Sequence, residues 1–354
     1  SPPLMSETNT TTSPSLAEQW QNLLADKPKL RIRDAATQLG VSEAQLLATR
    51  CGSKGVTRLE GDFQKLFNEF QNLGRIMCLT RNEDAVHERY GEFSTAEFFG
   101  HVGQVVGPDI DLRLFPAYIN LGFFVLDETP DGPRKSFQIF DAAGDAVHKV
   151  YLQAESDHAA ADALVKEYTS ANQSTEQEVK AYPAAPTPLP DSEIDAEGLQ
   201  KAWLALEDTH GFYGILRRFR VTREQALRLA PEGYAYKVSH DSTRKILEAA
   251  SASKTPIMVF IGSRGCIQIH TGLTENIKMF GEEWLNVLDD EFNMHLREPA
   301  ITGSWVVKKP TKDGDITALE VYDKDGEEIA LFFGKRKPGQ PEDEAWRKII
   351  GELS

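Results

Sequence analysis

Residues 111–114 read Asp-Leu-Arg-Leu, and about 181 positions later residues 293–296 read Asn-Met-His-Leu. The same offset relates several other pairs of segments along the chain. These pairs are Leu39-Gly40-Val41-Ser42 and Phe219-Arg220-Val221-Thr222, Ile76-Met77 and Ile257-Met258, Phe99-Gly100 and Phe280-Gly281, and Phe140-Asp141 with Gly144 and Tyr322-Asp323 with Gly326. A repeat of this length in a chain of 354 residues predicts two structurally similar halves.

A proline-rich stretch separates the two copies. Four prolines fall between Tyr182 and Pro190, and such a run can continue neither a helix nor a central strand. We therefore expect residues 17–169 to form the first half, 170–195 the linker and 196–354 the second half. Residues 1–16 are polar and rich in proline and threonine, which is typical of a disordered tail and not of a signal peptide.

Each half begins with helical patterns and continues with short segments rich in branched and aromatic residues, separated by turn signals such as Asp131-Gly132 and Asp313-Gly314. This order predicts an α+β fold with internal duplication, in which each half has an antiparallel sheet and helices. The predicted helices cover 15–25, 32–39, 42–50, 196–219 and 222–229. The predicted strands cover 76–79, 85–90, 110–114, 121–126, 136–141, 257–261, 266–271, 292–296, 303–307 and 318–322.

The composition excludes several classes of function. The net charge of −15 disfavours general nucleic-acid binding, and no apolar run is long enough to predict a membrane span. The cysteines at 51, 78 and 266 form neither a CxxC nor a CxxCH motif, so we expect no disulfide framework, no zinc ribbon and no covalent haem. A reducing, cytoplasmic compartment fits this cysteine usage.

The segment 195–219 contains a candidate ligand. Its apolar residues recur on one face of a helix, at Leu199, Trp203, Leu206, Tyr213 and Leu216. The position on that face between Leu206 and Tyr213 is occupied by His210, which is therefore predicted to point inward. Gly211 and Gly214 would leave room beside it for a flat ring such as a porphyrin, whose iron is commonly held by histidine. The first copy has Lys29-Leu30 at this place, so the fold itself does not require the histidine.

Cations are concentrated just after this histidine, at Arg217, Arg218, Arg220, Arg223 and Arg228. They can complement a helix C-terminus, or they can bind the carboxylates of a ligand through charge-assisted hydrogen bonds. The first copy has Glu43 where the second has Arg223, so the fold does not demand this charge either. Further basic groups lie at Lys308-Lys309 and around Arg336.

Segments throughout the chain resemble the haem-trafficking and haem-degrading proteins of bacterial haem uptake, the HemS/ChuS/PhuS type or hemin-degrading factor family. The resemblance runs from about residue 17 to near the C-terminus and includes the repeat. It is carried by residues 33–36, 39–43, 79–83, 86–88, 108–115, 138–141 and 146–150, by Asp208-Thr209-His210-Gly211-Phe212, and by residues 332–339.

This resemblance implies two similar halves packed as a pseudo-dimer, with haem between the sheet of one half and helices of the second. The family's axial histidine matches His210, and its distal arginine matches Arg113, the candidate catalytic residue. The residues that match its propionate contacts are Arg223, one of Lys308 and Lys309, and Arg336. Gly211, Tyr213 and Gly214 would line the same site. The chain departs from some members at Ala330 and Leu331, and at Gly211 and Tyr213.

The resemblance also implies haem b held non-covalently, received from an inner-membrane importer and either passed to a haem oxygenase or degraded by the protein itself. Two alternatives come from the residues. The segment from Ala35 to Leu47 resembles a helix-turn-helix, which would indicate a DNA-binding regulator, although Glu43 would begin its recognition helix. The second alternative is a structural repeat protein in which His210 is an ordinary core residue.

Overall fold

The structure, a computed structural model, describes residues 13–52, 54–337 and 339–354. Most of the predicted tail, residues 1–12, lies outside the described residues, and the first helix begins at Leu16. The helices of the first half are α2 (Leu16–Asp26), α3 (Ile32–Leu39), α4 (Glu43–Ala48), α5 (Phe63–Glu69) and α6 (His158–Tyr168). Its strands are β1 (Val56–Leu59), β2 (Arg75–Arg81), β3 (Ala85–Glu92), β4 (Ala96–Phe99), β5 (Val102–Val106), β6 (Asp111–Leu114), β7 (Leu121–Thr129), β8 (Gly132–Phe140) and β9 (Ala146–Leu152).

The second half repeats this order. Its helices are α7 (Ala196–Leu204), α8 (Gly211–Phe219), α9 (Arg223–Arg228), α10 (Ser242–Ser253) and α11 (Glu344–Gly351). Its strands are β10 (Ala235–Val238), β11 (Ile257–Gly262), β12 (Cys266–Gly272), β13 (Ile277–Phe280), β14 (Trp284–Leu288), β15 (Phe292–Arg297), β16 (Gly303–Thr311), β17 (Gly314–Tyr322) and β18 (Glu328–Gly334). Short 3-10 turns occur at Phe70–Leu73, Pro116–Tyr118, Asp191–Glu193 and Glu298–Ala300.

The strands form two nine-stranded sheets, and each sheet contains strands of both halves. Sheet A has the order β1-β7-β8-β9-β2-β3-β15-β14-β13, and sheet B has the order β10-β16-β17-β18-β11-β12-β6-β5-β4. The paired strands are antiparallel, as expected. The sequence predicts one sheet for each half, but each half instead contributes three strands to the sheet of the other. The exchange occurs at the β3–β15 and β12–β6 pairs and ties the two halves together.

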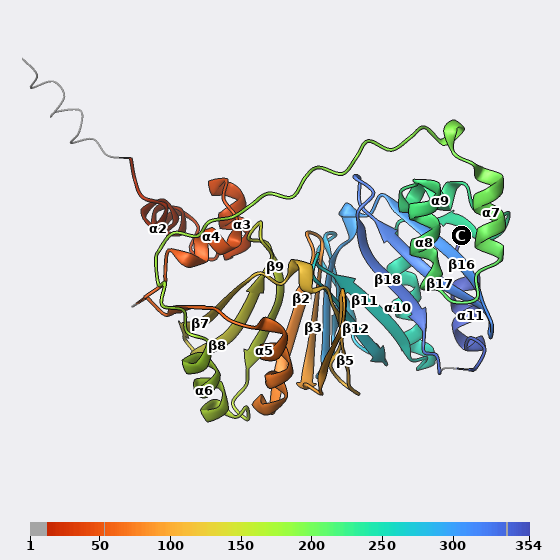
Figure 1. Cartoon of the computed structure of the whole chain (residues 1–354). Helices are drawn as coiled ribbons and strands as arrows, with labels where there is room; N and C mark the ends of the chain where they lie inside the picture. The colour runs from red at the N-terminus through yellow and green to blue at the C-terminus, as the bar shows by residue number, and fades with distance from the viewer. Residues whose placement is uncertain (1–12, 53, 338) are drawn as a thin grey trace, which may run out of the picture.

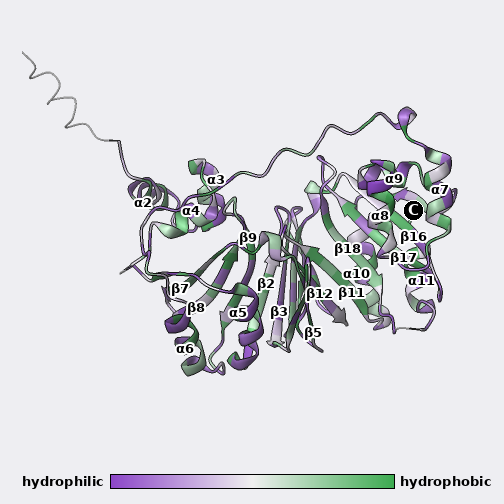
Figure 2. Cartoon of the chain, viewed as in Figure 1, coloured by the Kyte–Doolittle hydropathy of each residue, from purple (hydrophilic) through white to green (hydrophobic). Residues whose placement is uncertain are grey.

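The centres of the two sheets pack against each other, while helices fill the space where the sheets diverge (Figure 1). One apolar cluster joins α5 and α6 to both sheets, and a second does the same for α10 and α11. Strands such as β11 are largely hydrophobic, β3 is mixed, and the outer helices carry hydrophilic stretches (Figure 2). The outer face of each sheet carries the remaining helices, α2–α4 in the first half and α7–α9 in the second.

The linker runs in an extended form from the first half to the second, without an α-helix or strand across residues 170–190 (Figure 1). Arg58 holds its beginning by donating to the carbonyl oxygens of Asn172, Ser174 and Glu176. At its far end, Asp191 pairs with Arg228 at 2.9 Å. None of the helices in the described part of the chain is long and apolar enough to cross a membrane.

Candidate functional site

His210 lies at the start of α8, and the predicted inward position is wrong. The single helix expected over 196–219 is broken into α7, which ends at Leu204, and α8, which begins at Gly211. His210 is the N-cap of α8, and its side chain is 89% exposed. The apolar pattern therefore belongs to two separate helices, and Trp203 and Phe212 meet edge-to-face between them at 4.9 Å.

Asp208 holds His210 in place. One of its carboxylate oxygens, Oδ1, accepts from the backbone N–H of His210 at 2.9 Å and lies 2.7 Å from the ring nitrogen Nδ1. The backbone hydrogen bond of His210 is the main cause that keeps the pKa of Asp208 below its ordinary value, and the charge of Arg336 contributes as well. An ionised carboxylate can only accept, so Nδ1 of His210 is the donor, and in the neutral form of the ring Nε2 carries the lone pair.

The two glycines beside His210 have different roles. A Cβ atom on Gly211 would lie 3.0 Å from Cδ2 of Leu206, so this glycine allows close packing of the loop. A Cβ atom on Gly214 would meet nothing within 4 Å, so the surface one turn along the helix is open. Tyr213 is exposed on the same helix. The open surface near the histidine is therefore bordered by Gly214, whereas Gly211 is packed against Leu206.

A row of apolar side chains lies on the outer face of sheet B beyond these helices. In the strand register, Phe333 of β18, Met258 and Phe260 of β11 and Ile267 of β12 share the face on which α7–α9 pack. They are partly exposed, and the rings of Phe260 and Phe333 are 5.0 Å apart. The wall between α8 and β6 is thus apolar and open to a ligand.

Arg113 stands at the far side of this wall. It is opposite Ile267 in the β12–β6 ladder and so lies on the same outer face, although it belongs to the first half. Its Nη1 donates to Asp111 at 2.7 Å and to the carbonyl of Leu112 at 3.0 Å. Burial raises the pKa of Asp111, and the charge of Arg113 opposes that rise. Strands β12, β11 and β18 lie between β6 and β17, and neighbouring strands are about 4.8 Å apart. The width of these strands leaves room for one wide ring, with Arg113 on one side of the ring and α8 on the other.

Arg223 and Lys309 are turned into the protein beneath α8. Lys309 pairs with Glu320 at 3.1 Å, and Arg223 lies 3.3 Å from the same carboxylate and donates to the hydroxyl of Tyr322 at 2.7 Å. Although burial acts in the opposite direction, the charges of Arg223 and Lys309 hold the pKa of Glu320 at about 2. The ammonium of Lys309 lies 4.2 Å from the ring centre of Phe212. This cluster supports the first turn of α8 from below.

The remaining predicted basic residues are dispersed. Lys308 alternates with Lys309 along β16 and therefore faces the opposite side of the sheet. Arg336 pairs with Asp313 at 3.5 Å, and the adjacent Lys312 contacts Glu207, so Arg336 lies close to the loop that holds His210. Arg228 is paired with Asp191. The side chains of Arg217, Arg218 and Arg220 are exposed or partly exposed around the C-terminal end of α8.

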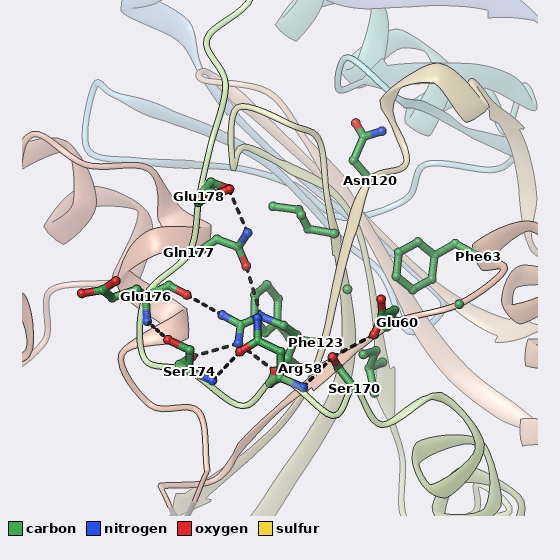
Figure 3. A pocket seen from close by; sticks show the side chains of 15 residues that line it. Arg58, Glu60, Phe63, Asn120, Phe123, Ser170, Ser174, Glu176, Gln177 and Glu178 are labelled. Atoms are coloured by element: carbon green, nitrogen blue, oxygen red, sulfur yellow. Dashed lines mark hydrogen bonds between the residues drawn. The ribbon is translucent and has the colours of Figure 1, made fainter.

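A separate polar pocket of about 480 Å³ lies in the first half, where the linker passes over β1 and β7 (Figure 3). Its walls include Arg58, Glu60, Phe63 and Phe123. The guanidinium of Arg58 already donates to carbonyl oxygens of the linker, so its contacts in this pocket serve to hold the linker.

The residues at α8 fit a haem. The site offers a histidine whose Nε2 is free, an apolar wall for the ring and a cation, Arg336, near the histidine loop. Cys51, Cys78 and Cys266 are free and buried. The role of Asp208 as the partner of His210 was not predicted, although the Asp-x-His spacing is visible in the sequence. Glu320 and the apolar wall were not predicted either, because they depend on strand register.

The DNA-binding alternative finds no support in the fold. Five of the six residues of α4, the would-be recognition helix, are buried, and its Glu43 pairs with Lys149 at 2.6 Å. A helix that reads the major groove must be free to enter it.

Comparison with known proteins identifies the family. The model of the haemin-degrading HemS.ChuX domain matches this chain twice, at residues 40–168 and 220–353. The hemin transport protein HmuS of Yersinia pestis is 38% identical over 342 residues, which cover 96% of this chain and 97% of the relative. The structure is similar to that of holo-PhuS, a heme-binding protein from Pseudomonas aeruginosa, with a TM-score of 0.93, 44% identity and coverage of 96% and 98% of the two chains.

It is also similar to that of ChuS, a heme oxygenase of E. coli, with a TM-score of 0.86, 35% identity and coverage of 96% and 99%. The two family matches fall on the two copies that the repeat defines, and the relatives align over nearly the whole chain. The chain therefore belongs to the haemin-degrading HemS/ChuX family.

Proposed function

We propose that this chain binds one haem b non-covalently and that His210 is the axial ligand of its iron. The observation that carries the proposal is the 2.7 Å contact between Asp208 and Nδ1 of His210 at an exposed helix start. A carboxylate on one ring nitrogen fixes the tautomer and raises the basicity of the other, which is the usual arrangement behind a histidine ligand. Haem as the ligand is supported by PhuS, which binds heme, and by HmuS, which transports hemin.

The other contacts follow from the same placement. The ring would rest on the apolar wall formed by Met258, Phe260, Ile267 and Phe333, and Arg336 would meet a propionate next to the histidine loop. Arg223 and Lys309 would act mainly through Glu320, because both cations are already paired with it. Arg113 would face the side of the iron opposite His210. The haem supplies the iron and its redox chemistry, whereas the protein supplies orientation and exclusion of water from one face of the ring.

The exposure of His210 favours a transfer role. An axial ligand that stands at the surface can be approached by a second protein, so haem can pass between proteins without unfolding of the site. We propose that the chain acts in the cytoplasm, accepts haem that an inner-membrane importer delivers and passes it to a haem oxygenase. The name of HmuS as a hemin transport protein supports this place in haem uptake.

Haem degradation is the second candidate function. It is favoured by Arg113, a hydrogen-bond donor at the far side of the apolar wall, and by the likeness to ChuS, a heme oxygenase. The two candidates share one binding site, so spectra of bound haem do not separate them. A single-turnover experiment does: the ferric complex is mixed with ascorbate in the presence of catalase. Loss of the Soret band with formation of a linear tetrapyrrole assigns degradation, and an intact Soret band contradicts it and leaves the transfer role as the function of the site.

A haem titration tests the proposal itself. We expect a Soret difference spectrum that saturates at one haem for each chain, because the first copy has Lys29-Leu30 in place of the histidine. Saturation at two equal sites would contradict the single site. The absence of any Soret change would instead favour the structural repeat protein without haem.

A further inference from the structure

The outer face of sheet A is the repeat counterpart of the apolar wall, and it is charged. At the offset of about 181 residues, Arg81 occupies the place of Gly262, Lys149 that of Leu331, Glu88 that of Ile269 and His295 that of Arg113. The strand registers put all four on one face, since Lys149 is opposite Leu79, Leu79 is opposite Glu88, Arg81 is opposite Val86, and Val86 is opposite His295. The fold does not require these charges, because the second half forms the same strands without them.

Most of these charged groups already have partners within the protein. Lys149 pairs with Glu43 at 2.6 Å, and His295 lies 3.0 Å from Glu88. Arg33, the counterpart of Tyr213, extends from α3 to Glu83 at 3.1 Å. The two charges within each pair offset each other, so this surface is not simply a basic patch.

Arg81 is different. Its guanidinium donates only to the backbone carbonyls of Asn82 at 3.1 Å and Glu83 at 3.4 Å, and it forms no ion pair within the described residues. It is partly buried, and burial together with the charge of Arg33 lowers its pKa. Lys149 lies within electrostatic reach, as do the carboxylates of Glu43, Glu83 and Asp34, which act against the lowering of this pKa. None of these carboxylates forms a direct ion pair with Arg81 in the described part of the chain, so an anion that binds its guanidinium would add a direct partner.

We propose that the first half contains a binding site for a compact oxyanion, phosphate or a small carboxylate, with Arg81 as its anchor and with Arg33 and Lys149 beside it. The planar guanidinium can bind such an anion through two parallel hydrogen bonds. A haem is disfavoured on this face, because the charged side chains of Arg81, Glu88 and Lys149 replace the apolar contacts that a porphyrin ring needs. The two halves would thus use one scaffold for two kinds of ligand.

Isothermal titration calorimetry of the full-length, haem-free protein tests the proposal, with inorganic phosphate in one arm and malonate in the other at constant ionic strength. We expect saturable binding of one anion for each chain in at least one arm, and the stronger arm identifies the kind of oxyanion. In that arm Arg81→Gln should weaken binding about tenfold or more, the usual effect of losing one charge-assisted contact. Arg33→Gln should weaken it less, and Arg218→Gln, at an exposed arginine of α8, should leave it unchanged.

Three outcomes would overturn the proposal: no saturable binding of either anion, equal binding by Arg81→Gln and the wild type, or a second haem that the wild type binds and Arg81→Gln loses. Thermal unfolding of each variant shows whether it is folded, and Arg33→Gln on the surface of α3 provides a second test if Arg81→Gln is not. The test uses no haem for its main readout, so its failure leaves the proposed function of His210 untouched.

Discussion

Asp208 and His210 are joined by two hydrogen bonds within one short loop, one to the backbone N–H at 2.9 Å and one to Nδ1 at 2.7 Å. The ring is therefore oriented by its own loop, even though its surface is exposed. This arrangement would keep the proposed ligand residue oriented at the protein surface.

Replacement of Asp208 by alanine should weaken haem binding without removing it. Loss of the partner of a metal-bound histidine typically lowers affinity by about 10-fold to 100-fold, because the tautomer and the ring orientation are no longer fixed. Haem affinity, measured by competition with an apo-globin, checks this. Glu207→Ala, at the exposed neighbouring acid, is the matched control and should bind as the wild type does.

Replacement of His210 by alanine should remove the axial bond and change the ferric and ferrous-CO spectra. Residual affinity should remain, because burial of the ring contributes roughly 25 cal/mol for each Å² of apolar surface. Tyr213, three residues along α8, is positioned to approach the iron instead, so the double variant with Tyr213→Phe should be weaker still. His240→Ala, at another exposed histidine, should keep the wild-type spectra. Wild-type spectra in His210→Ala, together with their loss on removal of another histidine, would show that His210 is not the ligand.

Replacement of Arg113 by alanine should leave haem affinity nearly unchanged but alter the sixth-ligand spectrum and any degradation rate. The reason is its position across the apolar wall from α8, where it contacts Asp111 and no residue of the histidine loop. Resonance Raman spectra of the ferric complex, with single-turnover rates, provide the measurement. Arg113→Lys keeps the charge and should restore part of the wild-type behaviour. If spectrum and rate are both unchanged in Arg113→Ala, the distal role is refuted.

Replacement of Glu320 by glutamine should destabilise the fold and loosen the site. Glu320 is fully buried between Arg223 and Lys309, so its removal takes away the ion-pair partner of Lys309 and leaves Arg223 with Glu328 alone, at 3.8 Å. We expect a cost of about 3 kcal/mol in the free energy of unfolding. Urea unfolding measures this change. The matched control is Glu83→Gln, which breaks the exposed pair with Arg33 and should cost about 1 kcal/mol or less. The prediction fails if the two variants are equally stable.

The fold should lose stability as the pH falls below about 6.5. Burial lowers the pKa of His148 to about 3 and that of His270 to about 4, whereas the unfolded chain takes up these protons near the ordinary value of 6.5. Their contribution is therefore complete above pH 6.5 and is lost as the pH falls towards the folded values, at about 1.4 kcal/mol for each pH unit and each histidine. Urea unfolding at several pH values between 7.5 and 4.5 measures the slope.

His148→Ala introduces the residue found at the repeat position, Ala330, and separates this effect from simple packing. The variant should be less stable at every pH because a buried ring is lost, but its slope against pH should decrease by one proton. His101→Ala, at an exposed histidine, should keep the wild-type slope. An unchanged slope in His148→Ala would contradict the prediction.

Local sequence was sufficient for the features that depend on neighbouring residues. Ser42 and Thr222 cap α4 and α9 through the same capping box, and both copies place a strand between two turn signals at corresponding positions. The repeat, the proline-rich linker and the α+β class can be predicted because these patterns are written in consecutive residues. His210 also became a candidate ligand from the sequence, through its place in the apolar pattern, the neighbouring glycines and arginines, and the resemblance to the family.

Only the tertiary structure determined what surrounds that histidine. A helical pattern over 195–219 cannot show that the chain turns at Leu204, because the turn depends on how Trp203 and Phe212 pack on β16 and β17. The exchange of three strands between the sheets places Arg113 of the first half on the sheet of the second, and no local pattern encodes such a pairing. The inward turn of Arg223 towards Glu320 likewise depends on residues 97 positions apart. The sequence alone determined which residues could perform the chemistry, whereas long-range packing and strand pairing determined which of them meet, since contacts between distant segments exist only once the whole chain is folded.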